Sequence, residues 1–93
     1  MEEKFIAAWA ANREKAQALG IRMRPVAPED ALKTARYLLD RNRASDGFDA
    51  LAARGQLALS LEALATDKRF TALFTDEQAN TALQRLLDAG YFL

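Results

Sequence analysis

The sequence predicts an all-α fold, a compact bundle of four or five short helices with room for one short extended segment near residues 56–60. Alanine and leucine supply most of the apolar side chains, whereas β-branched residues are scarce, a composition that favours helix over strand. Several segments also place apolar residues at helical spacing between capping residues. Because the chain has only 93 residues, we expect a single helical domain over residues 1–93.

The first segment, residues 2–19, carries an apolar stripe on one helical face, and Gly20 is suited to the left-handed conformation that ends a helix. The stripe consists of Phe5, Ala8, Trp9, Ala16 and Leu19. Asn12 falls on the same face. It is interpreted either as an asparagine at the edge of the buried face or as a polar device that sets the register of a helix pair.

A connector over residues 21–27 leads to a second helix. Pro28 suits its first turn, Glu29 and Asp30 complement the positive end of its dipole, and Arg41 and Arg43 complement the other end. Its apolar stripe is the clearest in the chain and consists of Ala31, Leu32, Ala35, Leu38 and Leu39.

The middle of the chain is less regular. Residues 45–47 form a turn that also offers a cap, so a short helix carrying Phe48, Leu51 and Ala52 is expected to end at Gly55. Residues 56–59 alternate like a strand and are expected to be extended or irregular, followed by a helix over 61–65 capped by Ser60. Asp67 then offers a cap for a further turn that carries Phe70, Leu73 and Phe74.

The last helix has the best-defined start, since Thr75 and Gln78 have the spacing of a capping box. It is expected to run through Ala89 and to end at Gly90. Its predicted buried stripe consists of Ala79, Ala82, Leu83, Leu86 and Leu87. Three large apolar residues follow at 91–93, and we expect them either to fold back across this stripe or to contact a partner.

The order of elements over residues 46–93, a short helix, a strand-like segment and two helices, resembles that of winged-helix domains. A winged-helix-like second half is therefore the alternative fold. Two features depart from that pattern: the helix in the recognition position begins with Asp76 and Glu77, which repel phosphate, and the chain stops where a basic wing would begin. The resemblance implies a protein-binding scaffold rather than a DNA reader.

Composition argues against most enzyme chemistry. The chain contains neither cysteine nor histidine, which removes disulfides, thiolate zinc sites and the commonest general base. Ser45 and Ser60 thus have no histidine partner, and Asp46 and Asp49 lack the further oxygen ligands of a calcium loop. We expect no catalytic activity, no cofactor and no metal. Acidic residues at the start and the lack of an apolar run of about 18 residues predict a cytoplasmic protein that does not cross a membrane.

The charges balance overall, but residues 21–45 carry a net charge of +3 and residues 46–93 a net charge of −3. Lys33, Tyr37 and Arg41 recur every four residues, a spacing that could follow a phosphate backbone. Helical pairs of Glu29 with Lys33 and of Arg36 with Asp40 indicate an ordinary solvated face instead. The candidate phosphate contacts are Arg22, Arg24, Lys33, Arg36, Tyr37, Arg41 and Arg43.

Large aromatic rings are numerous for helices this short, so their apolar surface is expected either to meet another chain in part or to be used entirely in a self-contained core. The candidate partner surface consists of Trp9, Tyr91, Phe92 and Leu93. The sequence therefore predicts a non-catalytic protein-protein interaction or regulatory module whose partner is another protein or a second copy in a homo-oligomer. The alternative is a small nucleic-acid-binding regulator that uses the basic residues of segment 22–43.

Overall fold

The computed structural model describes residues 2–91, which fold into five α-helices and three 3₁₀ turns without a β-strand. The α-helices are α1 (Glu2–Ala18), α2 (Ala31–Asp40), α3 (Phe48–Ala53), α4 (Leu61–Thr66) and α5 (Asp76–Asp88). The 3₁₀ turns are η1 (Pro28–Asp30), η2 (Leu57–Leu59) and η3 (Thr71–Leu73). The prediction of an all-α bundle of four or five helices is confirmed.

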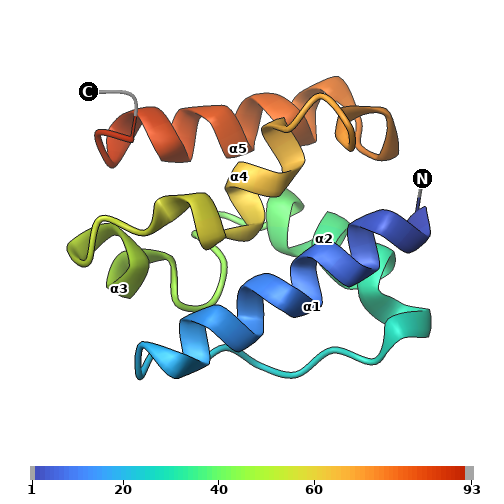
Figure 1. Ribbon diagram of the computed structural model, residues 1–93. Helices are drawn as coiled ribbons and strands as arrows, with labels where there is room; N and C mark the ends of the chain where they lie inside the picture. The colour runs from blue at the N-terminus through green and yellow to red at the C-terminus, as the bar shows by residue number, and fades with distance from the viewer. Residues whose placement is uncertain (1, 92–93) are drawn as a thin grey trace.

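Helix α4 lies in the middle of the bundle, with α5 on one side and α1 on the other (Figure 1). Helix α2 packs against both α1 and α5 and so closes the bundle behind α4. The connector over residues 21–27 runs in extended form along the side of α1 before it enters η1 (Figure 1). Helix α3 and η2 form one end of the molecule, next to the end of α1.

The core consists of two groups of buried side chains. The larger one is centred on Phe5, whose ring meets those of Phe70 and Phe74 edge-on with centroids 5.6 and 5.5 Å apart. These geometries are among those that aromatic pairs prefer. The smaller group fills the end near α3 and contains Ala16, Ile21, Phe48, Leu51, Leu57 and Leu86.

Local signals in the sequence place most helix ends correctly. Thr75 and Gln78 form the predicted capping box, with backbone-to-side-chain distances of 3.0 and 3.1 Å in the two directions. The Ser60 hydroxyl caps α4 by accepting a hydrogen bond from the Ala63 amide at 3.1 Å. The predicted stripe of α2 is likewise buried, with Leu32 only partly covered.

Two predictions for the middle of the chain are wrong. Residues 57–59 form a 3₁₀ turn rather than an extended segment, and Leu57 and Leu59 both pack on the smaller core group. Since residues 2–91 contain no strand, the winged-helix alternative is not the fold observed. The turn over residues 45–47 provides Gly47 as the N-cap residue of α3, which begins at Phe48 without a side-chain cap.

The predicted buried stripe of α5 is rotated relative to the observed one. Gln78, Ala82 and Leu86 are the buried residues of this helix, whereas Leu83 and Leu87 are exposed. Two polar side chains cause this rotation. Gln78 and Arg85 point inward, where Gln78 donates to Asp40 and Arg85 to Glu62, although a search for apolar residues places both on the solvent side. One side of the predicted stripe therefore faces outward.

The loop over residues 41–47 passes close to the connector at Gly47. Gly47 has a φ of 78°, and a Cβ atom added there would lie 3.0 Å from Met23 Cγ and 3.1 Å from Ile21 Cγ2. Gly55 also has a positive φ, 67°, but a Cβ atom there would meet nothing within 4 Å. The two glycines thus share the same conformational demand and differ in their surroundings.

We predict that Gly47→Ala destabilises the protein more than Gly55→Ala. Both variants suffer the cost of a left-handed alanine, about 1 to 2 kcal/mol, but only Gly47→Ala also crowds the connector, which adds about 1 to 3 kcal/mol. Urea unfolding followed by circular dichroism measures both free energies. Equal losses of stability in the two variants would show that the close approach of loop and connector is not important.

Candidate functional site

A buried carboxylate organises the centre of the molecule. Glu62 on α4 is 0% exposed and lies among apolar core residues such as Leu61 and Ala65, which is unusual for a carboxylate. Its Oε2 atom accepts a hydrogen bond from the Ser45 amide at 2.9 Å, and its Oε1 atom accepts one from the Ser45 hydroxyl at 2.5 Å. A charge removed from water in this way is tolerated only when paired and hydrogen-bonded.

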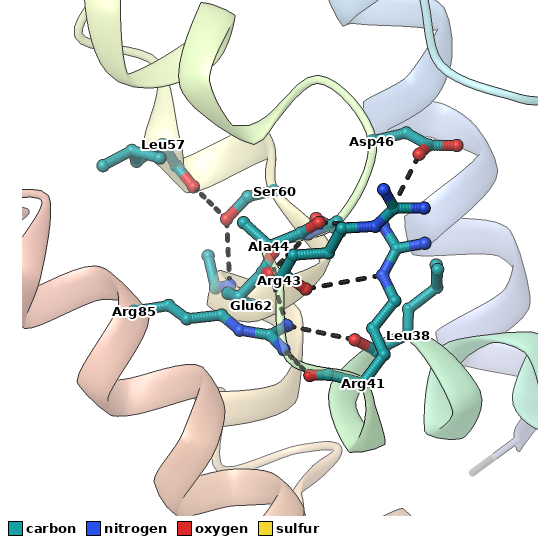
Figure 2. Close-up of polar contacts among 11 residues, drawn as sticks. Leu38, Arg41, Arg43, Ala44, Asp46, Leu57, Ser60, Glu62 and Arg85 are labelled. Atoms are coloured by element: carbon teal, nitrogen blue, oxygen red, sulfur yellow. Dashed lines mark hydrogen bonds and ion pairs between the residues drawn. The ribbon is translucent and has the colours of Figure 1, made fainter.

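Arg85 of α5 provides the opposite charge. Its Nη1 atom donates to Glu62 Oε2 at 3.0 Å and to the Leu38 carbonyl at 3.1 Å, while Nη2 donates to the Arg41 carbonyl at 2.7 Å (Figure 2). One guanidinium therefore ties α5 to α4 and to the end of α2. The carbonyls it reaches include those that helix α2 leaves without an internal partner at its C-terminus.

The same network fixes the loop over residues 41–46. Arg41 folds back so that Nη2 donates to the Ala44 carbonyl at 2.8 Å, and the same atom lies 3.7 Å from Asp46 Oδ1 (Figure 2). Arg24 of the connector lies 3.6 Å from the other oxygen of Asp46. Through Ser45 and Asp46, the loop is held against both α4 and the connector.

This loop forms one wall of a cavity of about 250 Å³, bounded on its other sides by α1, the connector, η1, α2 and the start of α4. Its apolar lining comes from Met23, Pro25, Val26, Leu38 and Leu61. Five charged residues also line it: Arg13, Arg24, Asp30, Arg41 and Asp46. Apolar walls with a few convergent polar groups are typical of sites for small molecules.

Two nitrogen atoms in the lining residues have no hydrogen-bond partner in residues 2–91. They are Nε1 of Trp9 and Nη1 of Arg13, and both atoms are buried. The Arg13 guanidinium lies over the Trp9 ring at 4.8 Å from its centroid. Burial lowers the pKa of Arg13 from its ordinary value, because removal from water disfavours the charged form. Buried donors without partners are rare in proteins.

The candidate phosphate contacts do not form one free basic surface. Arg36 donates from Nε and Nη2 to the Leu73 carbonyl at 3.0 and 2.7 Å, and Arg41 and Arg24 are engaged as described above. Arg22, Lys33 and Arg43 are exposed and make no hydrogen bond or ion pair through their side chains within residues 2–91. Tyr37 is 63% exposed and lines the cavity.

The candidate partner surface is also divided by the structure. Trp9 is only 3% exposed and belongs to the larger core group, so it does not offer a surface for a partner. Its packing follows from its position one helical turn after Phe5, on the face of α1 that meets the core. Tyr91 is 38% exposed, and residues 92 and 93 lie outside the described residues.

Sequence reasoning missed Glu62, Arg85 and Arg13. A signal existed for the first two: Glu62 lies three residues before Ala65 in a short apolar helix, and Arg85 lies three residues after Ala82 on the buried side of α5. Charged residues at positions on an inward face indicate a buried pair. For Arg13 no sequence signal was available, because its surroundings come from the connector.

Within residues 2–91, no group of three or more acidic side chains is arranged to hold a metal ion, and no helix is both long and apolar enough to span a membrane. Comparison of the chain with known protein-family models, curated proteins and solved structures found no match. The case for a function therefore depends on the geometry of the chain itself.

We predict that Glu62→Gln destabilises the protein by about 3 to 5 kcal/mol, because it leaves Arg85 as a buried charge without its counter-charge. The matched control is Glu14→Gln, an exposed site where the same change is expected to cost less than about 0.5 kcal/mol. Thermal and urea unfolding of the two variants provide the measurement. Equal stability of the two variants would mean that the Glu62 charge does not hold the centre together.

We predict weak and salt-dependent binding of nucleic acid. Of the seven candidate contacts, Arg22, Lys33 and Arg43 are the cations without an intramolecular partner, so the slope of log K against log salt should not be steeper than about −3 for duplex DNA. Fluorescence anisotropy of a labelled duplex over a salt series measures this slope. Tight, sequence-selective binding that persists at high salt would favour the nucleic-acid regulator over the protein-binding module.

Proposed function

We propose that the protein is a non-catalytic interaction module that binds another protein through the outer face of α5. The observation that carries this proposal is the exposure of Leu83 and Leu87, which are 39% and 50% exposed on adjacent turns of the same helix face. Tyr91 lies beyond the end of α5, after the left-handed Gly90, and is 38% exposed. Leu83 and Leu87 are called the α5 strip below.

The position of the α5 strip supports a docking role. Helix α5 runs along the outer edge of the bundle, and its inward side is occupied by Gln78, Ala82 and Leu86 (Figure 1). The leucines therefore cannot reach the core without a rotation that would remove Arg85 from Glu62. Apolar side chains held outward by a rigid framework are typical of contact surfaces.

The charges around the α5 strip indicate the chemistry of the partner. Asp76 lies seven residues before Leu83 and therefore on the same side of the helix, and Asp76 and Glu77 are both exposed. Residues 46–93 carry a net charge of −3. The partner that fits is an amphipathic helix whose apolar stripe is flanked by basic residues.

The proposal of a non-catalytic role is supported by how the polar groups are used. The Ser45 hydroxyl donates to Glu62, and the Glu62 oxygens accept from Ser45 and Arg85. The acid and the hydroxyl that come closest to a catalytic arrangement are thus used in structural hydrogen bonds. A general base must lie within reach of a substrate proton, and Glu62 is 0% exposed. A cytoplasmic address remains a prediction from the sequence.

We predict that the double variant Leu83→Gln/Leu87→Gln loses its protein partner and keeps its fold. Glutamine preserves helix propensity and the length of the side chain, so stability should change by less than about 0.5 kcal/mol per site. Affinity capture of the partner from native cells, with wild type and variant at equal loading, measures the loss. Light scattering on the purified proteins shows whether the partner is a second copy of this chain.

The matched control is Tyr37→Gln, which removes the most exposed ring on α2 and should retain the partner. Capture of the same proteins at the same level by wild type and by the double variant would contradict the proposal. Equal losses in the double variant and in Tyr37→Gln would contradict it as well, because the contact would then not be specific to α5.

A further inference from the structure

The 250 Å³ cavity beside α1 has features that binding of a protein at the α5 strip does not use. None of its lining residues lies on α5. Trp9 and Arg13 come from α1, Tyr37 and Leu38 from α2, and Leu61 from α4. Thr34 also lies on α2, and the remaining lining residues belong to the connector, to η1 and to the loop over residues 41–46. The cavity is therefore a separate place in the fold, and its role can be tested separately.

The charged groups around the cavity leave one cation uncompensated. Arg24 and Arg41 both lie within 4 Å of Asp46, at 3.6 and 3.7 Å. Arg13 has no ion-pair partner within residues 2–91, and its guanidinium is half-buried against Trp9. Three arginines and two aspartates line the cavity in all, which leaves a net charge of +1. An anion with a single charge would balance this lining.

The Arg13 side chain indicates the same chemistry. Its Nη1 atom and Nε1 of Trp9 are buried without partners and closed to solvent, so a ligand in the cavity meets the remaining, partly exposed portion of the Arg13 side chain. A guanidinium and a carboxylate also match in geometry, since two parallel N–H groups can meet two oxygens. Asp30 in the wall disfavours a second negative charge on the ligand.

The size and lining of the cavity define the rest of the ligand. An engineered apolar cavity of about 150 Å³ holds benzene, whereas drug-sized ligands occupy about 300 to 1,000 Å³. At about 250 Å³, this cavity suits one ring or a branched hydrocarbon chain with a short acidic arm. Val26, Leu38 and Leu61 supply apolar contacts for that hydrocarbon part.

We propose that this cavity binds a small apolar monocarboxylate, with the carboxylate on Arg13 and the hydrocarbon part against Val26, Leu38 and Leu61. Arg13 carries the charge that recognises the ligand. The Trp9 ring supports the Arg13 guanidinium, which lies 4.8 Å from the ring centroid. The loop over residues 41–46 closes the site from the opposite side, in the position that Glu62 and Arg85 give it.

The experiment is a titration with 3-phenylpropionate at neutral pH, where this probe is ionised. Trp9 is the single tryptophan of the chain, so its fluorescence reports directly on the cavity. We expect a saturable change with a dissociation constant of about 1 mM or tighter, which is the range for a ligand of this size. Isothermal titration calorimetry should give the same constant without using the Trp9 signal.

Two comparisons isolate the recognition of the charge. The neutral amide 3-phenylpropanamide has nearly the same shape and should bind at least about tenfold more weakly to the wild-type protein, as expected for loss of a charge-assisted hydrogen bond. Arg13→Met should weaken binding of the acid by a similar factor. Arg54→Met removes the same charge from an exposed position that lines no part of this cavity and should leave binding unchanged.

The proposal is overturned if neither compound gives a saturable signal or if acid and amide bind equally well to the wild-type protein. It is also overturned if Arg54→Met weakens binding as much as Arg13→Met, since the effect would then be one of overall charge. Arg13→Lys keeps the positive charge but lacks the two parallel N–H groups of the guanidinium, so it should bind the acid with intermediate affinity. Because α5 lies outside the cavity, the double variant Leu83→Gln/Leu87→Gln should bind 3-phenylpropionate like the wild type. This result is expected whether or not the double variant still binds a protein partner.

Discussion

The ion pair between Glu62 and Arg85 is the constraint on which the rest of the structure depends. Four segments meet at these two side chains: α4, α5, the end of α2 and the loop at Ser45. Apolar contacts among short helices allow many similar packings, because the hydrophobic effect has no preferred direction. A buried carboxylate with three defined donors accepts far fewer arrangements. The network therefore selects one way to pack helices of only six to seventeen residues.

The orientation of α5 follows from this constraint. With Arg85 turned toward Glu62 and Gln78 donating to Asp40 at 3.1 Å, the inward face of the helix is defined by polar residues as well as by Ala82 and Leu86. The leucines of the α5 strip then face outward as a geometric consequence. An exposed apolar face on α5 thus arises from the requirements of the interior.

The cavity depends on the same network from the other side. Ser45 is held by Glu62, and the Arg41 carbonyl is held by Arg85, so the loop that forms one wall has little freedom to close over the space. At the opposite wall, the connector approaches Gly47 too closely to move inward. An open, pre-formed site requires less reorganisation when a ligand binds.

The sequence by itself determined the helical class, the capping box at Thr75 and Gln78, the Ser60 cap and the buried face of α2, because these depend on residues within a few positions of one another. The tertiary structure alone decided the partner of Glu62, the rotation of α5, the burial of Trp9 and the cavity beside Arg13. Each of these joins side chains from segments distant in the chain. The physical reason is that local propensity fixes where a helix begins and ends, whereas the choice among its faces is made by pairing and desolvation across the whole molecule.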